Sequence, residues 1–187
     1  SLKTLERTNL STKTCVGEII WGDARKKVHE IPLETKFDLI FHDAFSPQQC
    51  PELWSEEFLQ KLSLRLAPNG KLITYSSSAA IRGSLKRAGL IVKSITPIDK
   101  NNKKWSIGTI ATLESANSSS NNSSKYYHSL TPREEEHLLT KAAVPFRDPN
   151  GYGTTNQILS RRSQEQELSD LLSTSSWRKR WNNQRSS

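Results

Sequence analysis

The residues best suited to chemistry lie within residues 37–54, FDLIFHDAFSPQQCPELW. A nearly continuous apolar run, residues 37–41, is followed by the carboxylate of Asp43 and the aromatic ring of Phe45. Such a run is typical of a strand buried on both faces of a parallel sheet. Ligands of open α/β sheets bind beyond the carboxyl ends of the strands, where this carboxylate and ring could hold an amine. An aspartate after a strand is also a common turn former, so that alternative stays open.

A second carboxylate, Asp23, follows another predicted strand over residues 14–21. It lies within the segment Gly22-Asp23-Ala24 and is the predicted N-cap of a short helix over residues 24–30. A carboxylate can also accept a hydrogen bond from an exocyclic amino group. One residue can fill both roles.

Alternating helix and strand patterns surround these two carboxylates. Ser55 is the predicted N-cap of a helix that has an apolar face and that residues 67–70 end. Two later strands with a polar turn between them are predicted to form an antiparallel hairpin. The strands predicted after this helix are residues 71–75, 90–95 and 106–112.

Serines 76–78 precede a helix predicted to begin near Ala79. No Gly-x-Ser-x-Gly elbow surrounds them, so they are interpreted as helix caps, with Ser77 lining the pocket. The apolar stripe of this helix includes Ile81, and Arg82 lies off that stripe. We therefore expect Arg82 to face solvent or the phosphates of RNA.

The composition favours a polar, basic protein. Of 187 residues, 34% are hydrophobic and the formal net charge is +8. Residues 1–113 carry 17 Lys/Arg against 11 Asp/Glu, a surplus of 6, which favours a phosphate-rich partner such as RNA, although solubility alone could explain it. Neither the 2 cysteines nor the 4 histidines have metal-ligand spacing, so no metal is predicted. No apolar stretch is long enough for a membrane span and no signal-peptide pattern appears, which predicts a cytoplasmic protein without a membrane partner.

The chain is predicted to consist of an α/β domain over residues 1–114, a Ser/Asn-rich linker over 115–127 and a helical extension over 128–187. Thr131 begins a capping box in that extension. The basic-aromatic segment 177–181 can stack on RNA bases or serve as a packing anchor. The chain contains no methionine and starts at Ser1, so we expect a fragment of a longer protein. The sequence leaves the oligomeric state open.

The segment Asp43-Ala44-Phe45-Ser46-Pro47, with Trp54 downstream, resembles the motif of the methyltransferase domain of MnmC-type enzymes, which modify the wobble uridine of tRNA. The resemblance implies an α/β, Rossmann-like fold that uses S-adenosyl-L-methionine. This chain would supply the later half of the sheet, with its terminal antiparallel hairpin and a C-terminal helical extension. The implied reaction transfers a methyl group to an amine, the aminomethyl group of a tRNA wobble uridine.

The resemblance also implies roles for particular residues. Asp43 would orient the amine and help to remove its proton, while Phe45 and Pro47 wall the pocket. Trp54 would brace the loop or stack on the base. The cofactor's adenine amino group would bind at the segment Gly22-Asp23-Ala24. The segment around Ser77 and Arg82 also resembles the family, and both are expected to contact substrate.

Two features of the family are expected upstream and are missing here: the glycine-rich loop after the first strand and the acid after the second. Their absence predicts an exposed sheet edge beside residues 37–41 and allows this chain alone to be inactive. A non-catalytic RNA-binding or protein-interaction module is therefore the alternative function. A nicotinamide oxidoreductase is disfavoured because its glycine fingerprint is equally missing.

Overall fold

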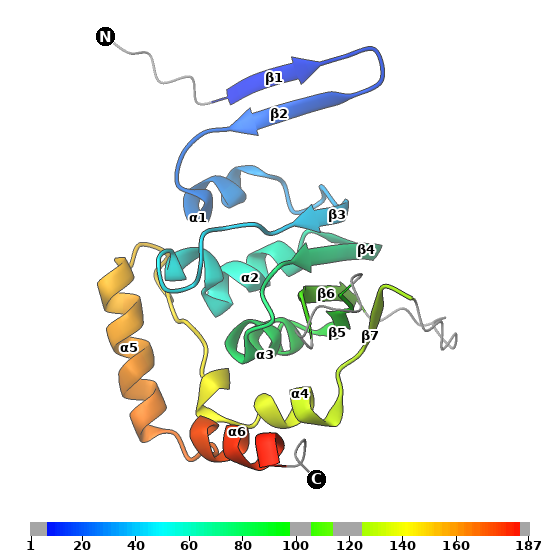
Figure 1. Ribbon diagram of the computed structural model, residues 1–187. Helices are drawn as coiled ribbons and strands as arrows, with labels where there is room; N and C mark the ends of the chain where they lie inside the picture. Colours follow the sequence, from blue (N-terminus) through cyan, green and yellow to red (C-terminus); the bar gives the residue numbers. More distant parts are fainter. Residues whose placement is uncertain (1–6, 98–105, 114–124, 184–187) are drawn as a thin grey trace.

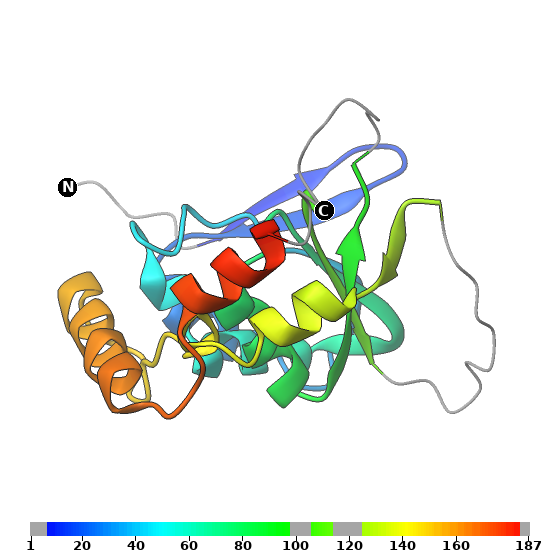
Figure 2. The ribbon, with the colours of Figure 1, turned by 60° about the horizontal axis from the view of Figure 1, so that its bottom comes forward.

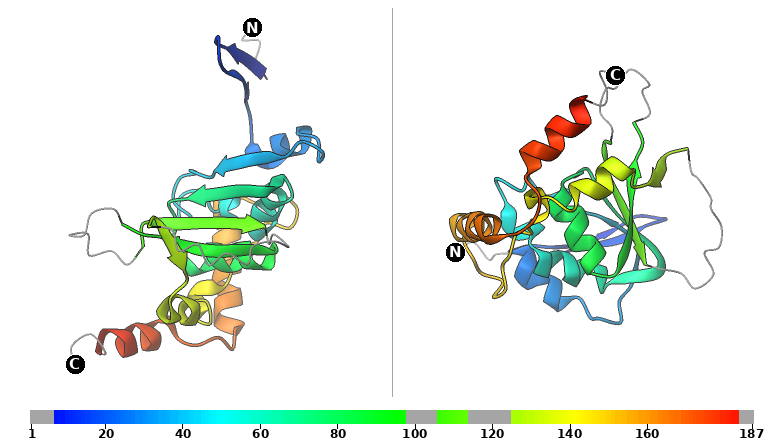
Figure 3. Two further views of the ribbon diagram at one scale, coloured as in Figure 1. Left: turned by 90° about the vertical axis from the view of Figure 1, so that its right-hand side faces the viewer. Right: turned by 90° about the horizontal axis from the view of Figure 1, so that it is seen from below.

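The structure is a computed structural model that describes residues 7–97, 106–113 and 125–183 (Figure 1). Its centre is a five-stranded sheet with strand order β3-β4-β6-β5-β7. Strands β3 and β4 are parallel, and the remaining neighbours are antiparallel. The helices gather on one side of this sheet (Figure 3). The sheet strands are β3 (Phe37–Phe41), β4 (Leu66–Thr74), β5 (Leu90–Ile95), β6 (Gly108–Leu113) and β7 (Tyr127–Ser129).

The N-terminal strands form a separate two-stranded sheet. Strand β1 (Arg7–Ser11) pairs antiparallel with β2 (Val16–Ile20), and the hairpin stands away from the main sheet (Figure 1). The predicted strand over 14–21 is confirmed. Strand β1 was not predicted, and residues 1–6 lie outside the described part of the chain.

Strand β3 lies at the edge of the main sheet, and it pairs there with β4. Its prediction as a strand buried on both faces is wrong, because Leu39 is 46% exposed and Phe41 is 70% exposed. The expected exposed sheet edge is therefore confirmed. A cavity of about 230 Å³ beside the strand is mostly apolar and is lined by Val28, Ile31, Phe37, Leu39, Ile40, Leu62 and Arg65.

Local capping begins the next helices as predicted. Asp23 caps α1 (Ala24–Lys27), which continues into a 3-10 turn, η1 (Val28–Glu30). Another 3-10 turn, η2 (Pro51–Trp54), leads to α2 (Glu56–Ser63), where the Ser55 hydroxyl accepts a hydrogen bond from the Phe58 amide. The predicted stop at residues 67–70 is wrong, because α2 ends earlier and β4 already begins at Leu66.

Helix α3 (Ala79–Arg87) packs with α2 over the sheet and ends before Gly89, whose φ of 83° suits the left-handed turn. Strands β5 and β6 pair antiparallel, with Val92 opposite Ala111, so the predicted hairpin pairing is confirmed. Strand β7 was not predicted. It extends the sheet by pairing with β5. The hydrophobic core lies between the sheet and these helices. Its buried residues include Trp54, Leu59, Leu72, Ile81, Leu85, Phe146 and Ile158.

The C-terminal part is helical: α4 (Pro132–His137), η3 (Lys141–Ala143), α5 (Thr155–Leu168) and α6 (Thr174–Asn183). The Thr131 capping box is confirmed at the start of α4. Helices α4 and α6 lie side by side (Figure 2). Between them, Trp177 of α6 is buried, and its ring stacks on the His137 ring of α4 with the ring centroids 4.2 Å apart. Trp177 is therefore a packing anchor. Within the described ranges, no helix has the length and hydropathy needed to cross a bilayer.

Candidate active site

The loop after β3 is held in place by two aromatic side chains. The Trp54 indole nitrogen donates a hydrogen bond to the Phe45 carbonyl at 2.5 Å. The Tyr75 hydroxyl donates to the Ala44 carbonyl at 3.0 Å. Both bonds reach backbone carbonyls directly after Asp43, so the loop that carries the carboxylate has a fixed path.

The predicted site residues on this loop differ in exposure. Asp43 is exposed, and Phe45 is 75% exposed. Pro47 is half-buried. Trp54 is fully buried, so the expectation that it could stack on a substrate base is wrong and its bracing role is the one observed. The side chains available to a ligand are therefore the carboxylate and the Phe45 ring.

Tyr75 is a site residue that the sequence analysis missed. It follows β4, and its ring lies edge-on to Trp54 at 5.7 Å. Burial raises the pKa of Tyr75, and the charges of Asp43 and Cys50 raise it further. The hydroxyl therefore stays protonated and remains a donor to the loop. The signal available in the sequence was its place at the end of a predicted strand, next to the end of β3.

His42 supports the loop from within the core. Its amide donates to the Ile73 carbonyl at 2.9 Å, which continues the pairing of β3 with β4. Its ring packs 4.4 Å from Trp54 and 5.9 Å from Phe58. Burial lowers the pKa of His42 to about 4, and its Nε2 atom has no hydrogen-bond partner among the described residues.

This burial predicts an acid-sensitive fold. The folded-state pKa of His42 lies below its ordinary value of 6.5, so the unfolded chain binds the proton more readily. Stability is therefore lost as the pH falls from about 6.5 to about 4. The shift corresponds to about 3 kcal/mol. We expect His42→Phe to remove this part of the pH dependence in urea unfolding followed by circular dichroism.

His29→Gln is the matched control, because His29 is exposed. It should leave the pH profile as in the wild type. His137, whose pKa burial and nearby arginines also lower to about 4, stays in both variants and keeps part of the acid sensitivity. Equal profiles for His42→Phe and the wild type would contradict the prediction.

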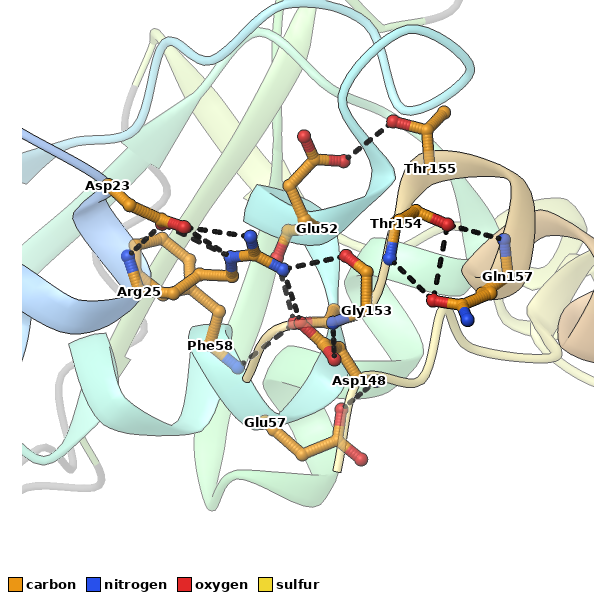
Figure 4. A network of polar contacts seen from close by, with 11 residues as sticks. Asp23, Arg25, Glu52, Glu57, Phe58, Asp148, Gly153, Thr154, Thr155 and Gln157 are labelled. Atoms are coloured by element: carbon orange, nitrogen blue, oxygen red, sulfur yellow. Dashed lines mark hydrogen bonds and ion pairs between the residues drawn. The ribbon is translucent and has the colours of Figure 1, made fainter. Parts of the chain in front are cut away.

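Asp23, the second predicted carboxylate, belongs to a network that joins distant segments (Figure 4). It accepts bonds from the Arg25 amide at 2.9 Å and from the Arg25 guanidinium at 2.7 Å. The same guanidinium pairs with Asp148 at 2.8 Å and donates to the Gly153 carbonyl at 2.9 Å. The Arg25 hydrogen bond lowers the pKa of Asp23, which keeps it ionised as an acceptor.

The Asp23 carboxylate fits one part of the implied cofactor. Its side chain remains 34% exposed beside Arg25. A carboxylate has about four lone-pair sites, which leaves room for one more donor such as an exocyclic amine. Gly22 has a φ of 134°, which favours glycine, and the Lys27 side chain covers it.

Electrostatic coupling joins this network to the loop. Burial raises the pKa of Cys50, Glu52 raises it further, and the charge of Arg25 opposes this shift by a smaller amount. Asp43 and Cys50 in turn add to the effect of burial in raising the pKa of Tyr75. Helix α1, which Asp23 caps, also contacts η2 at the end of the loop formed by residues 43–54.

Ser77 and Arg82 have different surroundings. Ser77 is half-buried in the turn before α3. Arg82 is 1% exposed, and the expectation that it faces solvent or RNA is wrong. Its guanidinium pairs with the fully buried Glu134 at 2.8 Å and also bonds Thr109 at 2.9 Å. Arg82 is therefore a core residue that ties α3 to β6 and α4.

Comparison with known proteins gives this arrangement a family. Residues 1–105, more than half of the chain, match the model of a family described as S-adenosyl-L-methionine-dependent methyltransferase. A crystal structure of MnmC2 from Aquifex aeolicus superimposes with a TM-score of 0.66 at 33% identity, covering 79% of this chain and 44% of that one. The predicted Rossmann-like methyltransferase fold and the resemblance to MnmC are thereby confirmed.

Sequence relatives agree with this match. An uncharacterized protein of Methanocaldococcus jannaschii is 30% identical over 146 residues, which cover 78% of this chain and 37% of that protein. The tRNA 5-methylaminomethyl-2-thiouridine biosynthesis bifunctional protein MnmC of Campylobacter hominis is 32% identical over 43% of this chain and 12% of its own length. Its counterpart in Aromatoleum aromaticum is 36% identical over 46% of this chain and 13% of its own length. The chain thus spans well under half of each relative.

Proposed function

This chain belongs to the family of S-adenosyl-L-methionine-dependent methyltransferases, and from this premise we propose that it takes part in methylating an amine on tRNA. The proposed acceptor is the aminomethyl group of the wobble uridine. One observation carries the proposal. Asp43 is an exposed carboxylate at the carboxyl end of β3, on a loop pinned by Trp54 and Tyr75.

Asp43 is the proposed base. Bound S-adenosyl-L-methionine would supply an electrophilic methyl group on a sulfonium, whose sulfur would keep the electrons of the broken S–C bond and leave as a thioether. The acceptor nitrogen must therefore offer a free lone pair. The carboxylate accepts a hydrogen bond from the amine N–H, which orients that lone pair, and it takes up the proton released after the new N–C bond forms. The fixed loop contributes by holding the amine in line.

The neighbouring residues complete the pocket in this proposal. The exposed ring of Phe45 forms a flat wall beside the amine, and Pro47 stiffens the loop behind it. Ser77, at the turn before α3, is the remaining proposed substrate contact. Trp54 and Tyr75 act as positioning residues, because their hydrogen bonds go to the loop backbone.

For the cofactor, we propose that Asp23 accepts from the adenine amino group, with Gly22 and Ala24 lining the approach. The remaining exposure of its carboxylate supports this role. The proposal gives the chain no contact to the methionine end of the cofactor.

The proposed RNA partner rests on charge and on relatives. The net charge is +8, and the names of the MnmC relatives place them in tRNA biosynthesis. The division into residues 1–114, 115–127 and 128–187 stays a prediction. Pairing of β5 with β7 and of Arg82 with Glu134 joins the first and last parts. Residues 115–124 of the proposed linker lie outside the described part of the chain.

The decisive test measures cofactor and tRNA together. Methyl-labelled S-adenosyl-L-methionine is offered to the purified chain with tRNA that carries an unmethylated aminomethyl uridine. The matched control is the same tRNA without that aminomethyl group. We expect label only in the first tRNA, and calorimetry should detect cofactor binding.

Label in both tRNAs would contradict the proposed acceptor. Binding of tRNA without any binding of S-adenosyl-L-methionine would contradict methyl transfer by this chain and favour a non-catalytic RNA-binding module. Repeating both measurements with the chain joined to an upstream segment of a relative, which supplies the glycine-rich loop, separates a missing cofactor loop from a wrong function.

A further inference from the structure

A second cavity is lined by α5 and by the segment 147–153 that precedes it in the chain. Figure 1 shows these two parts of the backbone next to each other. The volume of the cavity is about 500 Å³. Most of its lining residues carry polar side chains, and none of them is a residue proposed for catalysis. The lining residues are Arg147, Asp148, Pro149, Asn150, Tyr152, Gly153, Asn156, Gln157, Ile158, Ser160, Arg161 and Gln164.

The free charges at this cavity are positive. Its carboxylate, Asp148, is already compensated by Arg25 at 2.8 Å and by the Gly153 amide at 2.9 Å. Arg147 is paired with Glu57 at 3.1 Å. Arg161 is exposed and has no ion-pair partner among the described residues. An anionic ligand therefore meets one uncompensated guanidinium here.

A second cation stands beside the loop. The Lys61 ammonium lies 3.9 Å from the position of a Cβ on Gly151, and Lys61 likewise has no ion-pair partner in the part of the chain that the structure describes. Gly151 has a φ of 74°, so the chain turns sharply at this point. Lys61 belongs to α2 and Arg161 to α5, so each of these helices contributes one cation at or beside the cavity.

An aromatic ring and amide groups share the same walls. Tyr152 is 69% exposed. Asn156, Ser160 and Gln164 are spaced four residues apart and therefore follow one another on a single face of α5. Amides offer both donors and acceptors, which suits the edge of a base, and an exposed aromatic ring suits its flat face.

We propose that this cavity binds a nucleotide of a single-stranded RNA segment, and the proposal rests on the proposed tRNA substrate. The base stacks on Tyr152 and is contacted by the amides of α5. Its phosphates meet Arg161 and Lys61. A flat, hydrogen-bonding and anionic ligand matches all three features, whereas an apolar peptide matches only the aromatic ring.

The cavity is connected to the proposed cofactor residue through one guanidinium. Asp148 and Gly153 line the cavity, and both bond Arg25, which also holds Asp23 (Figure 4). A nucleotide in the cavity would therefore lie near the segment proposed for the cofactor while leaving Asp43 free. This arrangement suits a nucleotide next to the target.

The test uses the full chain and a fluorescently labelled single-stranded RNA oligonucleotide, read by anisotropy at several salt concentrations. Loss of stacking in Tyr152→Leu should weaken binding by about 5- to 150-fold. Arg161→Gln should weaken binding and reduce the salt slope by about 0.7 for each lost phosphate contact. Tyr126→Leu and Arg178→Gln are matched controls, because both residues are exposed and lie outside the cavity.

Equal losses in Arg161→Gln and Arg178→Gln would overturn the proposal, because they indicate unspecific attraction of a basic surface. If uridine monophosphate binds as tightly as the RNA oligonucleotide, the assignment of RNA as the ligand is overturned. The proposed function can fail independently of this proposal. If the cavity variants lose RNA binding but the wild type transfers no methyl group, the cavity is supported as an RNA-binding site and methyl transfer is contradicted. If the wild type transfers the methyl group but both cavity variants bind RNA as the wild type does, the proposed function stands and the cavity proposal is overturned.

Discussion

Replacement of Asp43 by asparagine is expected to slow methyl transfer by about 10²- to 10⁴-fold, the usual contribution of a positioned general base. Asparagine keeps the size of the side chain and its hydrogen-bonding oxygen, but it cannot take up a proton at neutral pH. The single-turnover rate of label transfer to aminomethyl tRNA measures this step. Asp43 is exposed, so the substitution should leave the fold intact.

Asp38→Asn is the matched control, because Asp38 is an exposed aspartate within β3. It should transfer the methyl group at the wild-type rate. The affinities of both variants for cofactor and for RNA are measured in parallel, so that a loss of rate is separated from a loss of binding. An unchanged rate in Asp43→Asn would show that the carboxylate is not the base.

The largest loss of stability is expected from breaking the buried pair of Arg82 and Glu134. Both side chains are almost completely buried, at 1% and 0% exposure. Removing one partner leaves the other charge buried without compensation, which costs about 3–5 kcal/mol. Arg82→Met should therefore lower the free energy of unfolding by that amount in urea denaturation.

The double variant Arg82→Met/Glu134→Gln tests the reason for the loss. It removes both charges, so it should be less destabilised than the sum of the two single variants. Lys86→Gln is the control, because it breaks the exposed pair with Glu135, whose side chains are 43% and 49% exposed. That pair should contribute about 0–1 kcal/mol. Equal losses in Lys86→Gln and Arg82→Met would contradict the argument.

Several features followed from the sequence because their physical cause is local. The helix starts at Ser55 and Thr131 depend on hydrogen bonds that span three residues, which the residue types already specify. Asp43 was recognised because an apolar run places it at a strand end. The same reasoning identified Asp23 as a helix cap.

The burial of individual side chains required the tertiary structure. Arg82 lies off an apolar stripe, and its burial depends on Glu134, which is 52 residues away. In sequence, Glu134 is an ordinary member of a capping box. Trp54 has a side chain of the type that stacks on bases, but in the fold its indole points inward and donates a hydrogen bond to the Phe45 carbonyl.

The sequence by itself determined the family, the order of most strands and helices, and the carboxylate on which the proposed chemistry depends. These rest on periodicity, capping and a short motif, all of which are read from neighbouring residues. Only the tertiary structure decided that β3 lies exposed at a sheet edge, that Tyr75 holds the loop, and that the loop before α5 forms a cavity with it. The physical reason is that exposure, a bridging hydrogen bond and a cavity each depend on segments distant in the chain.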